Sequence, residues 1–388
     1  MNKPIAACVQ AQPFSVIRDM AARAAQYADA ISLSIGEPDF HTPPAVCEAA
    51  LRDALAGQTH YAPSNGEAGL RAALLEHIRA KGHAGVAQEN LLITSGAMHG
   101  LLAVMRTLLN AGDEVITLAP HFSDYKGHVG LAGGTLVPVV TRFEDGFLPC
   151  EEALEAAITP RNRVLLINSP CNPTGVVLPA ASLDMLAAFA QRHDLIVVSD
   201  EVYDSLCWTG RAESIYTRAG MQERTVVLNS FSKACAMTGW RVGYAYGPAW
   251  LMGQMVKVLS YSVASTSTIG QRAALAALTG PQDEFVAMRE AFGRRVALAA
   301  RRLAAMPGVR CLPPSGAFYL FPRFEAAVQD SMAFALELLE ATHVVVVPGF
   351  AFGPQEATCG CVRIACTVDE AKLNTAFDRM EAWLKGKK

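Results

Sequence analysis

The feature that most constrains the fold is an alternation of short apolar runs with longer helical stretches, which extends from about Val46 to Ala277. Several of these runs are continuous and rich in Val, Ile and Leu, as in strands that are buried on both faces. This alternation favours an α/β fold with a mostly parallel sheet flanked by helices. The expected strands are Leu91–Thr94, Glu114–Leu118, Thr135–Val140, Val164–Ser169, Leu195–Asp200, Thr225–Asn229 and Arg241–Tyr246, and the helices between them include Met98–Leu109 and Ser182–His193.

The pattern changes after Pro281, where one long helix is followed by short strands and further helices. This order is typical of a smaller α+β domain, and a chain of 388 residues is longer than one typical domain. We therefore expect a large domain over residues 45–282 and a small domain made of residues 1–44 and 283–388. The expected elements of the small domain are the helices Asp283–Met306, Ser331–Glu340 and Asp369–Leu384 and the strands Phe318–Phe321, Val344–Val347 and Val362–Ala365.

The composition limits the class of protein. The chain is 51% hydrophobic and 18% charged, as in a globular protein with a large core, and its net charge of −3 gives no reason to expect nucleic acid as a partner. No apolar run reaches the length of about 18 residues that a membrane span needs. The ten cysteines are scattered singly, without a C-x-x-C pair or a signal peptide, which favours reduced thiols in a cytoplasmic protein. Cys359 and Cys361 flank Gly360, but a metal there needs two further ligands that the sequence does not place, so no metal is expected.

The stretch from Ser230 to Lys233 carries the strongest chemical signal. A lysine just after a buried strand, among hydroxyls and small residues, is poorly placed for a surface salt bridge. Its pKa of about 10.4 falls when the amine is desolvated or close to positive charge, and the amine then attacks carbonyls. Ser230, Ser232 and the nearby Arg241 together suit a phosphate that is attached to an aldehyde. The alternative is an ordinary strand-end lysine that extends to water.

This stretch and Gly239-Trp240-Arg241-Val242-Gly243 resemble the S-x-S-K and G-x-R-x-G motifs of the class I/II aminotransferases, the fold-type-I pyridoxal-phosphate enzymes. The matching segments follow the family's order, from Gly36 to Arg363. The resemblance implies an α/β large domain with a mostly parallel sheet and a smaller α+β domain. It also implies that Lys233 carries pyridoxal 5'-phosphate as a Schiff base and is the catalytic general base.

Two further segments resemble cofactor-binding parts of the family. Asn172-Pro173-Thr174-Gly175 looks like the N-P-T-G turn, and Asp200-Glu201-Val202-Tyr203 looks like D-E-x-Y. A carboxylate at the carboxyl end of a strand faces the crevice where α/β sheets bind ligands. The resemblance implies that Asp200 keeps the pyridine nitrogen protonated and that Tyr203 and Asn172 hydrogen-bond the ring oxygen. The alternative for Asp200 is a helix N-cap.

Three more segments bear on the cofactor. Gly96-Ala97-Met98 opens an expected helix, whose free N–H groups bind phosphate well. Met98 departs from the family, because many relatives have a polar or charged residue there. Phe122 matches the aromatic residue that stacks on the pyridine ring. Tyr61 and Gly66 resemble Y-x-x-x-x-G, whose tyrosine contacts the phosphate of the neighbouring subunit, so the resemblance implies a homodimer with shared active sites.

The substrate contacts are also implied by the resemblance. Arg363 lies between β-branched neighbours, and its fork suits a carboxylate. It matches the arginine that binds the amino acid's α-carboxylate, although a surface arginine is the alternative. Gly36, in a segment like G-x-P-x-F, would bring its backbone close to the same carboxylate. Phe122 and Asn172 complete the expected substrate-binding set.

The resemblance implies an aminotransferase that moves an amino group from an L-amino acid to a 2-oxo acid, with 2-oxoglutarate or pyruvate as acceptor. A lyase or synthase on the same scaffold, such as a C–S β-lyase, shares these motifs. A non-catalytic effector-sensing domain is a second alternative, but the distance of Gly36 from the first residue leaves no room for a DNA-binding domain before it. The donor is not determined, nor are the roles of Arg18, His121 and Tyr125.

Overall fold

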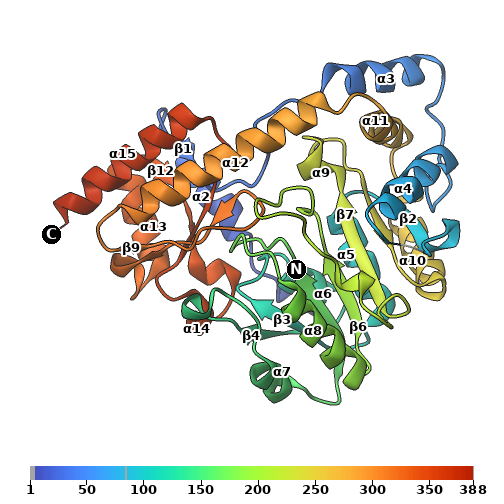
Figure 1. The fold of residues 1–388 in the computed structure, drawn as a ribbon, viewed down its shortest axis with the longest axis horizontal. Coiled ribbons are helices and arrows are strands. Elements are labelled where there is room, and N and C mark those ends of the chain that lie inside the picture. The colour runs from blue at the N-terminus through green and yellow to red at the C-terminus, as the bar shows by residue number, and fades with distance from the viewer. Residues whose placement is uncertain (1–4, 84, 388) are drawn as a thin grey trace.

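The computed structural model describes residues 5–83 and 85–387, and Figure 1 shows their arrangement. A seven-stranded sheet forms the centre of the larger part, in the order β2-β8-β7-β6-β5-β3-β4. All its strand pairs are parallel except those of β8, which runs antiparallel to both neighbours. The strands are β2 (Leu91–Thr94), β3 (Glu114–Ala119), β4 (Thr135–Val140), β5 (Asn162–Asn168), β6 (Ile196–Asp200), β7 (Thr225–Ser230) and β8 (Gly243–Tyr246).

Helices cover both faces of this sheet, because its strands are apolar on both sides. In β5, Val164 and Leu166 belong to one hydrophobic cluster, whereas Leu165 and Ile167 belong to another. This period of two places α5, α6 and α10 on one face and α7 and α8 on the opposite face, with α3, α4 and α11 packed near the β2 edge. The bounds are α3 (Pro44–Leu55), α4 (Ala68–Ala80), α5 (Ala97–Leu108), α6 (Tyr125–Leu131), α7 (Glu151–Ala157), α8 (Ala180–Arg192), α9 (Phe231–Ala234), α10 (Ala249–Val263) and α11 (Thr268–Thr279).

The C-terminal part has its own hydrophobic cluster, which also takes in Met20 and Leu33 from the N-terminal region. The long helix α12 leads from the large sheet into this part (Figure 1). A three-stranded sheet, β10-β14-β13, lies here, and β1 pairs in parallel with β12. The bounds are α1 (Ala7–Gln10), α2 (Val16–Ala24), β1 (Ile31–Ser32), α12 (Asp283–Ala304), β9 (Val309–Arg310), β10 (Tyr319–Leu320), β11 (Arg323–Phe324), α13 (Ser331–Thr342), β12 (Val344–Val345), β13 (Val347–Pro348), α14 (Gln355–Thr358), β14 (Val362–Ala365) and α15 (Glu370–Gly386).

The predicted fold class is confirmed, with two local differences. The expected strand Val344–Val347 is split into β12 and β13, which pair with different partners, β1 and β14. The expected strand Arg241–Tyr246 begins only at Gly243, because Arg241 has a φ of 56° and leaves the extended conformation. The domain division stays a prediction, and residues 1–4, 84 and 388 of its ranges lie outside the described part.

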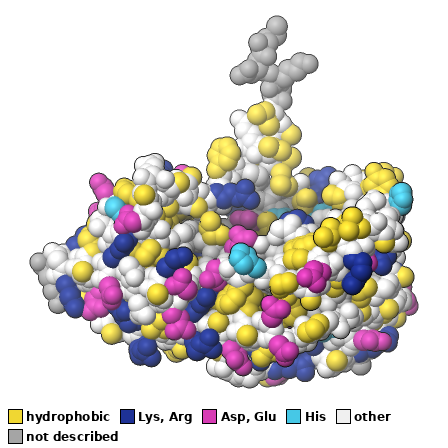
Figure 2. Space-filling model, turned by 90° about the horizontal axis from the view of Figure 1, so that it is seen from above, with side chains coloured by type: hydrophobic (Ala, Val, Ile, Leu, Met, Phe, Trp, Pro, Cys, Tyr) yellow, Lys and Arg dark blue, Asp and Glu magenta, His cyan; other side chains and the backbone are white. Residues whose placement is uncertain are grey.

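The first described residues, around α1, project away from the rest of the molecule, upward in Figure 2. Hydrophobic side chains are exposed along them, including Phe14, which is 99% exposed. In the part of the chain that the structure describes, none of the helices has the length and apolar character that a membrane crossing requires.

Candidate active site

A pocket of about 590 Å³ lies where β6 and β7 end, between the large sheet and the C-terminal part. Residues from widely separated segments meet in it, because the parallel strands end at the same edge of the sheet. Tyr61 does not line the pocket and is 88% exposed, while Gly96 lies just behind Arg241. The predicted site residues that line the pocket are Gly36, Ala97, Met98, Phe122, Asn172, Asp200, Tyr203, Ser230, Ser232, Lys233, Arg241 and Arg363.

Lys233 extends from the short helix α9, directly after β7. The Ser230 hydroxyl caps this helix by accepting from the N–H of Ser232. Lys233 Nζ donates to the carbonyl oxygen of Gly36 at 2.6 Å. Burial lowers the pKa of Lys233 to about 8, against the opposing effect of Glu37. The amine therefore loses its proton far more readily than an exposed lysine does.

Asp200 ends strand β6, next to Asn168 in the register with β5. Burial raises the pKa of Asp200 to about 6. Two hydrogen bonds oppose that rise: Tyr125 Oη donates to Asp200 Oδ2 at 2.7 Å, and the N–H of Val202 donates to Oδ1 at 3.3 Å. These two donors hold the Asp200 carboxylate in place, and it remains mostly ionised at neutral pH.

Arg241 and the start of α5 form a cradle of hydrogen-bond donors. Gly96 is the N-cap of α5 with a φ of 78°, and a Cβ added there would lie 2.4 Å from Arg241 Nη2. Arg241 donates to the carbonyl oxygens of Thr238 at 3.0 Å and Ser95 at 3.4 Å, and it forms no ion pair with a described residue. The Ser230 and Ser232 hydroxyls, 2.9 Å apart, line the same pocket. Free helix N–H groups, two hydroxyls and a guanidinium together suit a phosphate.

Arg363 lies on β14 and is only 1% exposed. It donates to Asn172 Oδ1 at 3.0 Å and to the carbonyl of Ser34, whereas its Nε has no partner among the described residues. Burial lowers the pKa of Arg363, and the nearby tyrosines Tyr319 and Tyr203 oppose this. A buried cation with only neutral partners is costly, so this arginine is suited to a ligand that brings a negative charge.

Tyr319 is a pocket residue that the motifs did not reveal. Its hydroxyl hydrogen-bonds that of Tyr203 at 2.9 Å, and its ring lies 4.7 Å from the guanidinium carbon of Arg363. A Cβ on Gly36 would lie 1.8 Å from the Tyr319 hydroxyl, which explains why glycine is needed there. Within the apolar run Phe318–Phe321 only its hydroxyl distinguishes it, so no local pattern points to its role.

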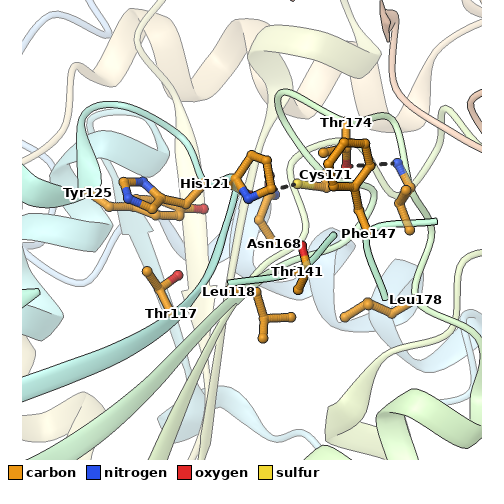
Figure 3. Close-up of a pocket in the computed structure, with 12 residues that line it drawn as sticks. Thr117, Leu118, His121, Tyr125, Thr141, Phe147, Asn168, Cys171, Thr174 and Leu178 are labelled. Carbon is orange, nitrogen blue, oxygen red and sulfur yellow. Dashed lines mark hydrogen bonds between the residues drawn. The ribbon is translucent and has the colours of Figure 1, made fainter. Parts of the chain in front are cut away.

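His121 and Tyr125 are not among the residues that line the pocket. Both line a small cavity of about 20 Å³, shown in Figure 3, and their rings lie 6.2 Å apart. His121 Nδ1 is 2.9 Å from the carbonyl oxygen of Phe122, and burial lowers the pKa of His121. Tyr125 is 1% exposed and directed at Asp200, so it acts on the pocket from behind.

The whole chain is similar to proteins of one family. A family model described as aminotransferase class I and II matches residues 28–380. The arginine–pyruvate transaminase of Pseudomonas aeruginosa is 40% identical over 92% of this chain and 91% of its own length. The aspartate/prephenate aminotransferase of Thermus thermophilus is 42% identical over 91% of each chain. The solved structure of the Thermus thermophilus aspartate aminotransferase with maleate has a TM-score of 0.93 and 39% identity, over 98% of this chain and 100% of that one. The chain therefore belongs to the class I and II aminotransferase family.

Proposed function

We propose that this pocket performs transamination with pyridoxal 5'-phosphate, moving an amino group from an L-amino acid to 2-oxoglutarate or pyruvate. The observation that carries the proposal is the convergence of Lys233, Asp200, Arg241 and Arg363 in one pocket. Their charges suit the parts of this cofactor and of an amino acid: an aldehyde, a pyridine nitrogen, a phosphate and an α-carboxylate. Fold type alone would not support the proposal, because one scaffold can serve several reactions.

The residues present fit the cofactor. The cradle beside Gly96, which a Cβ would obstruct, leaves Arg241 facing the start of α5. There Arg241, Ser230, Ser232 and the N–H groups of Ala97 and Met98 would hold the phosphate. Asp200 would pair with the pyridine nitrogen, Tyr203 and Asn172 would hydrogen-bond the ring oxygen, and Phe122 would contact the ring. Bound pyridoxal phosphate supplies the electron sink that the reaction needs.

Lys233 provides the proton transfer. With a pKa of about 8, a useful fraction of its amine is neutral near neutral pH. Nζ would take the proton from the Cα of the donor and, in the second half of the reaction, deliver a proton to the Cα of the new amino acid. Arg363 would hold the α-carboxylate throughout, with Asn172 fixing the plane of its guanidinium.

Exposed apolar side chains support a homodimer with shared active sites. Tyr61 is 88% exposed, and Leu55 on α3 and Tyr261 on α10 are 80% and 94% exposed. Together with the apolar segment around Phe14 (Figure 2), they leave hydrophobic surface that a second copy would cover. In the proposed dimer Tyr61 contacts the cofactor phosphate of the partner subunit. We expect the dimer to be cytoplasmic and to need no metal, nucleic acid or membrane.

Absorbance spectroscopy tests the proposal. The purified protein with pyridoxal phosphate should show a band above about 320 nm from the cofactor held by Lys233. L-amino acids added one at a time should shift this band, with release of a 2-oxo acid and without ammonia. Ammonia without such a shift would favour the alternative lyase.

The Lys233→Ala variant is the direct test of the catalytic amine. It should lose the band, and its turnover should fall by at least about 10⁴-fold. The reason is that no general base then removes the proton from the Cα of the amino donor. Circular dichroism checks that the variant folds, and a folded variant that still turns over would contradict the proposal.

A further inference from the structure

The charged side chains of the pocket exceed those that transamination itself uses. Lys233, Asp200, Arg241 and Arg363 have tasks in the proposed function, and the charge of Glu37 acts on the amine of Lys233. Two charges are left, on Asp124 and Arg18.

Asp124 is held firmly at the pocket wall. It directly precedes α6, whose first residue, Tyr125, is buried and bonded to Asp200. The hydroxyl of Ser123 donates to Asp124 Oδ1 at 2.9 Å, and none of the described Lys, Arg or His side chains forms an ion pair with it. The charge of Asp124 also acts on Arg363, where it opposes the lowering of the pKa by burial. A partly buried carboxylate is thus present within electrostatic range of the arginine that would bind the α-carboxylate.

Arg18 is held less firmly than Asp124. It lies on α2, which is anchored through Met20 and Ala24, and its own side chain is exposed to water. An exposed guanidinium keeps its hydration, whereas a partly buried carboxylate has lost part of it. A ligand cation therefore gains more at Asp124 than a ligand anion gains at Arg18.

Part of the pocket wall is apolar. Ile17 and Ala21 from α2, Ile35 from the segment after β1, and Met98 from α5 line it. Such a surface suits the methylene groups of a long side chain. A donor with methylenes in the middle and a cation at its end would match both the wall and the carboxylate.

We infer that the amino donor carries a cationic side chain, as L-arginine, L-ornithine and L-lysine do, with its α-carboxylate at Arg363 and its terminal cation at Asp124. The inference rests on the proposed function and specifies its substrate class. A guanidinium has the planar fork that pairs with a carboxylate through two hydrogen bonds, so L-arginine is the preferred member.

The test compares donors on the holoenzyme. L-arginine and L-norleucine both present methylene groups to the apolar wall, but only the first is cationic. We expect a higher kcat/KM for L-arginine, and we expect Asp124→Asn to lower the arginine-to-norleucine ratio by about 10- to 100-fold, the value of a charge-assisted hydrogen bond. Asp124→Glu, which keeps the charge, should retain part of the preference. Arg18→Gln is the matched control and should leave the ratio within about threefold, as expected for an exposed charge.

A binding measurement separates recognition from turnover. 5-Guanidinopentanoate has the carboxylate and the cation of arginine but no α-amino group, so it cannot react. Calorimetry should show that it binds the holoenzyme more tightly than hexanoate, and that Asp124→Asn removes the difference.

Three outcomes would contradict the inference. Neutral donors that react as well as L-arginine would overturn it and leave the aminotransferase standing, as would a preference for L-aspartate that Arg18→Gln abolishes. A holoenzyme that transaminates no amino acid would instead overturn the proposed function, and the inference with it.

Discussion

At the scale of single residues, burial changes two ionisable groups in opposite directions. It lowers the pKa of Lys233 to about 8 and raises that of Asp200 to about 6. Both shifts reflect the cost of a charge away from water. The motifs identified both residues, but the shifts depend on neighbours such as Tyr125 and Glu37 that lie far away in the sequence.

The raised pKa of Asp200 predicts how the stability of the cofactor-free protein depends on pH. The folded state binds this proton more tightly than the unfolded state, whose carboxyl has a pKa near 3.8. Stability from this group is therefore fully present below about pH 4 and is lost as the pH rises through about 6. Relative to Asp200→Asn, the wild type should lose about 2 to 3 kcal/mol across this range.

Urea unfolding of both proteins from pH 4 to pH 7, without pyridoxal phosphate, measures this difference. The Asn variant is the control for every other titrating group, because only residue 200 differs. A difference that stays constant with pH would show that Asp200 titrates normally.

At the scale of elements, the start of α5 and the turn that holds Arg241 fit each other closely. Gly96 and Arg241 both have positive φ values, 78° and 56°. Similarly, the segment around Gly36 is fixed by α12, where Arg295 forms an ion pair with Asp39 at 2.6 Å and lies over the Phe40 ring. The strands of the large sheet were predicted to within a few residues, but these contacts between elements were not.

Gly96→Ala should weaken cofactor binding. The new Cβ would lie 2.4 Å from Arg241 Nη2, and alanine is strained at this φ, so the cradle must change shape. We expect the Kd of pyridoxal phosphate to rise by about 10- to 100-fold, the loss of one or two charge-assisted hydrogen bonds. Fluorescence titration of the cofactor-free protein measures this Kd.

Gly57→Ala is the matched control. Gly57 has a similar φ of 86°, but a Cβ there would have no atom within 4 Å. Alanine there also has to adopt a positive φ, but away from the pocket, so the Kd of this variant should stay near that of the wild type. Equal effects of the two substitutions would show that strain, rather than the cradle, causes the loss.

At the scale of the whole molecule, the exposed Tyr61 predicts that active sites are shared between two copies. Lys233 and Tyr61 would belong to the same site but come from different subunits. Mixed dimers of Lys233→Ala and Tyr61→Ala subunits would then contain one site with both changes and one site with neither. Mixing the inactive Lys233→Ala protein with the impaired Tyr61→Ala protein should therefore restore up to about half of the wild-type activity per mixed dimer.

Activity after denaturation and refolding of the mixture measures this restoration. A mixture of Lys233→Ala with Asp200→Ala is the control, because both residues come from one subunit and no intact site can form. If the Tyr61 mixture recovers no more activity than this control, the sites are not shared.

The sequence by itself determined the fold class and the family, and it predicted site residues such as Lys233, Asp200 and Arg363, which line one pocket. It could do so because strand burial leaves a continuous apolar pattern and because the motifs are short, local segments. Only the tertiary structure decided that Tyr319 lies against Gly36, that Tyr125 supports Asp200 from behind, and that Asp124 remains as a charge in the pocket. Those contacts join residues far apart in the chain. Side chains lose hydration only when the elements pack together, and this loss shifts a pKa or leaves a charge without a partner.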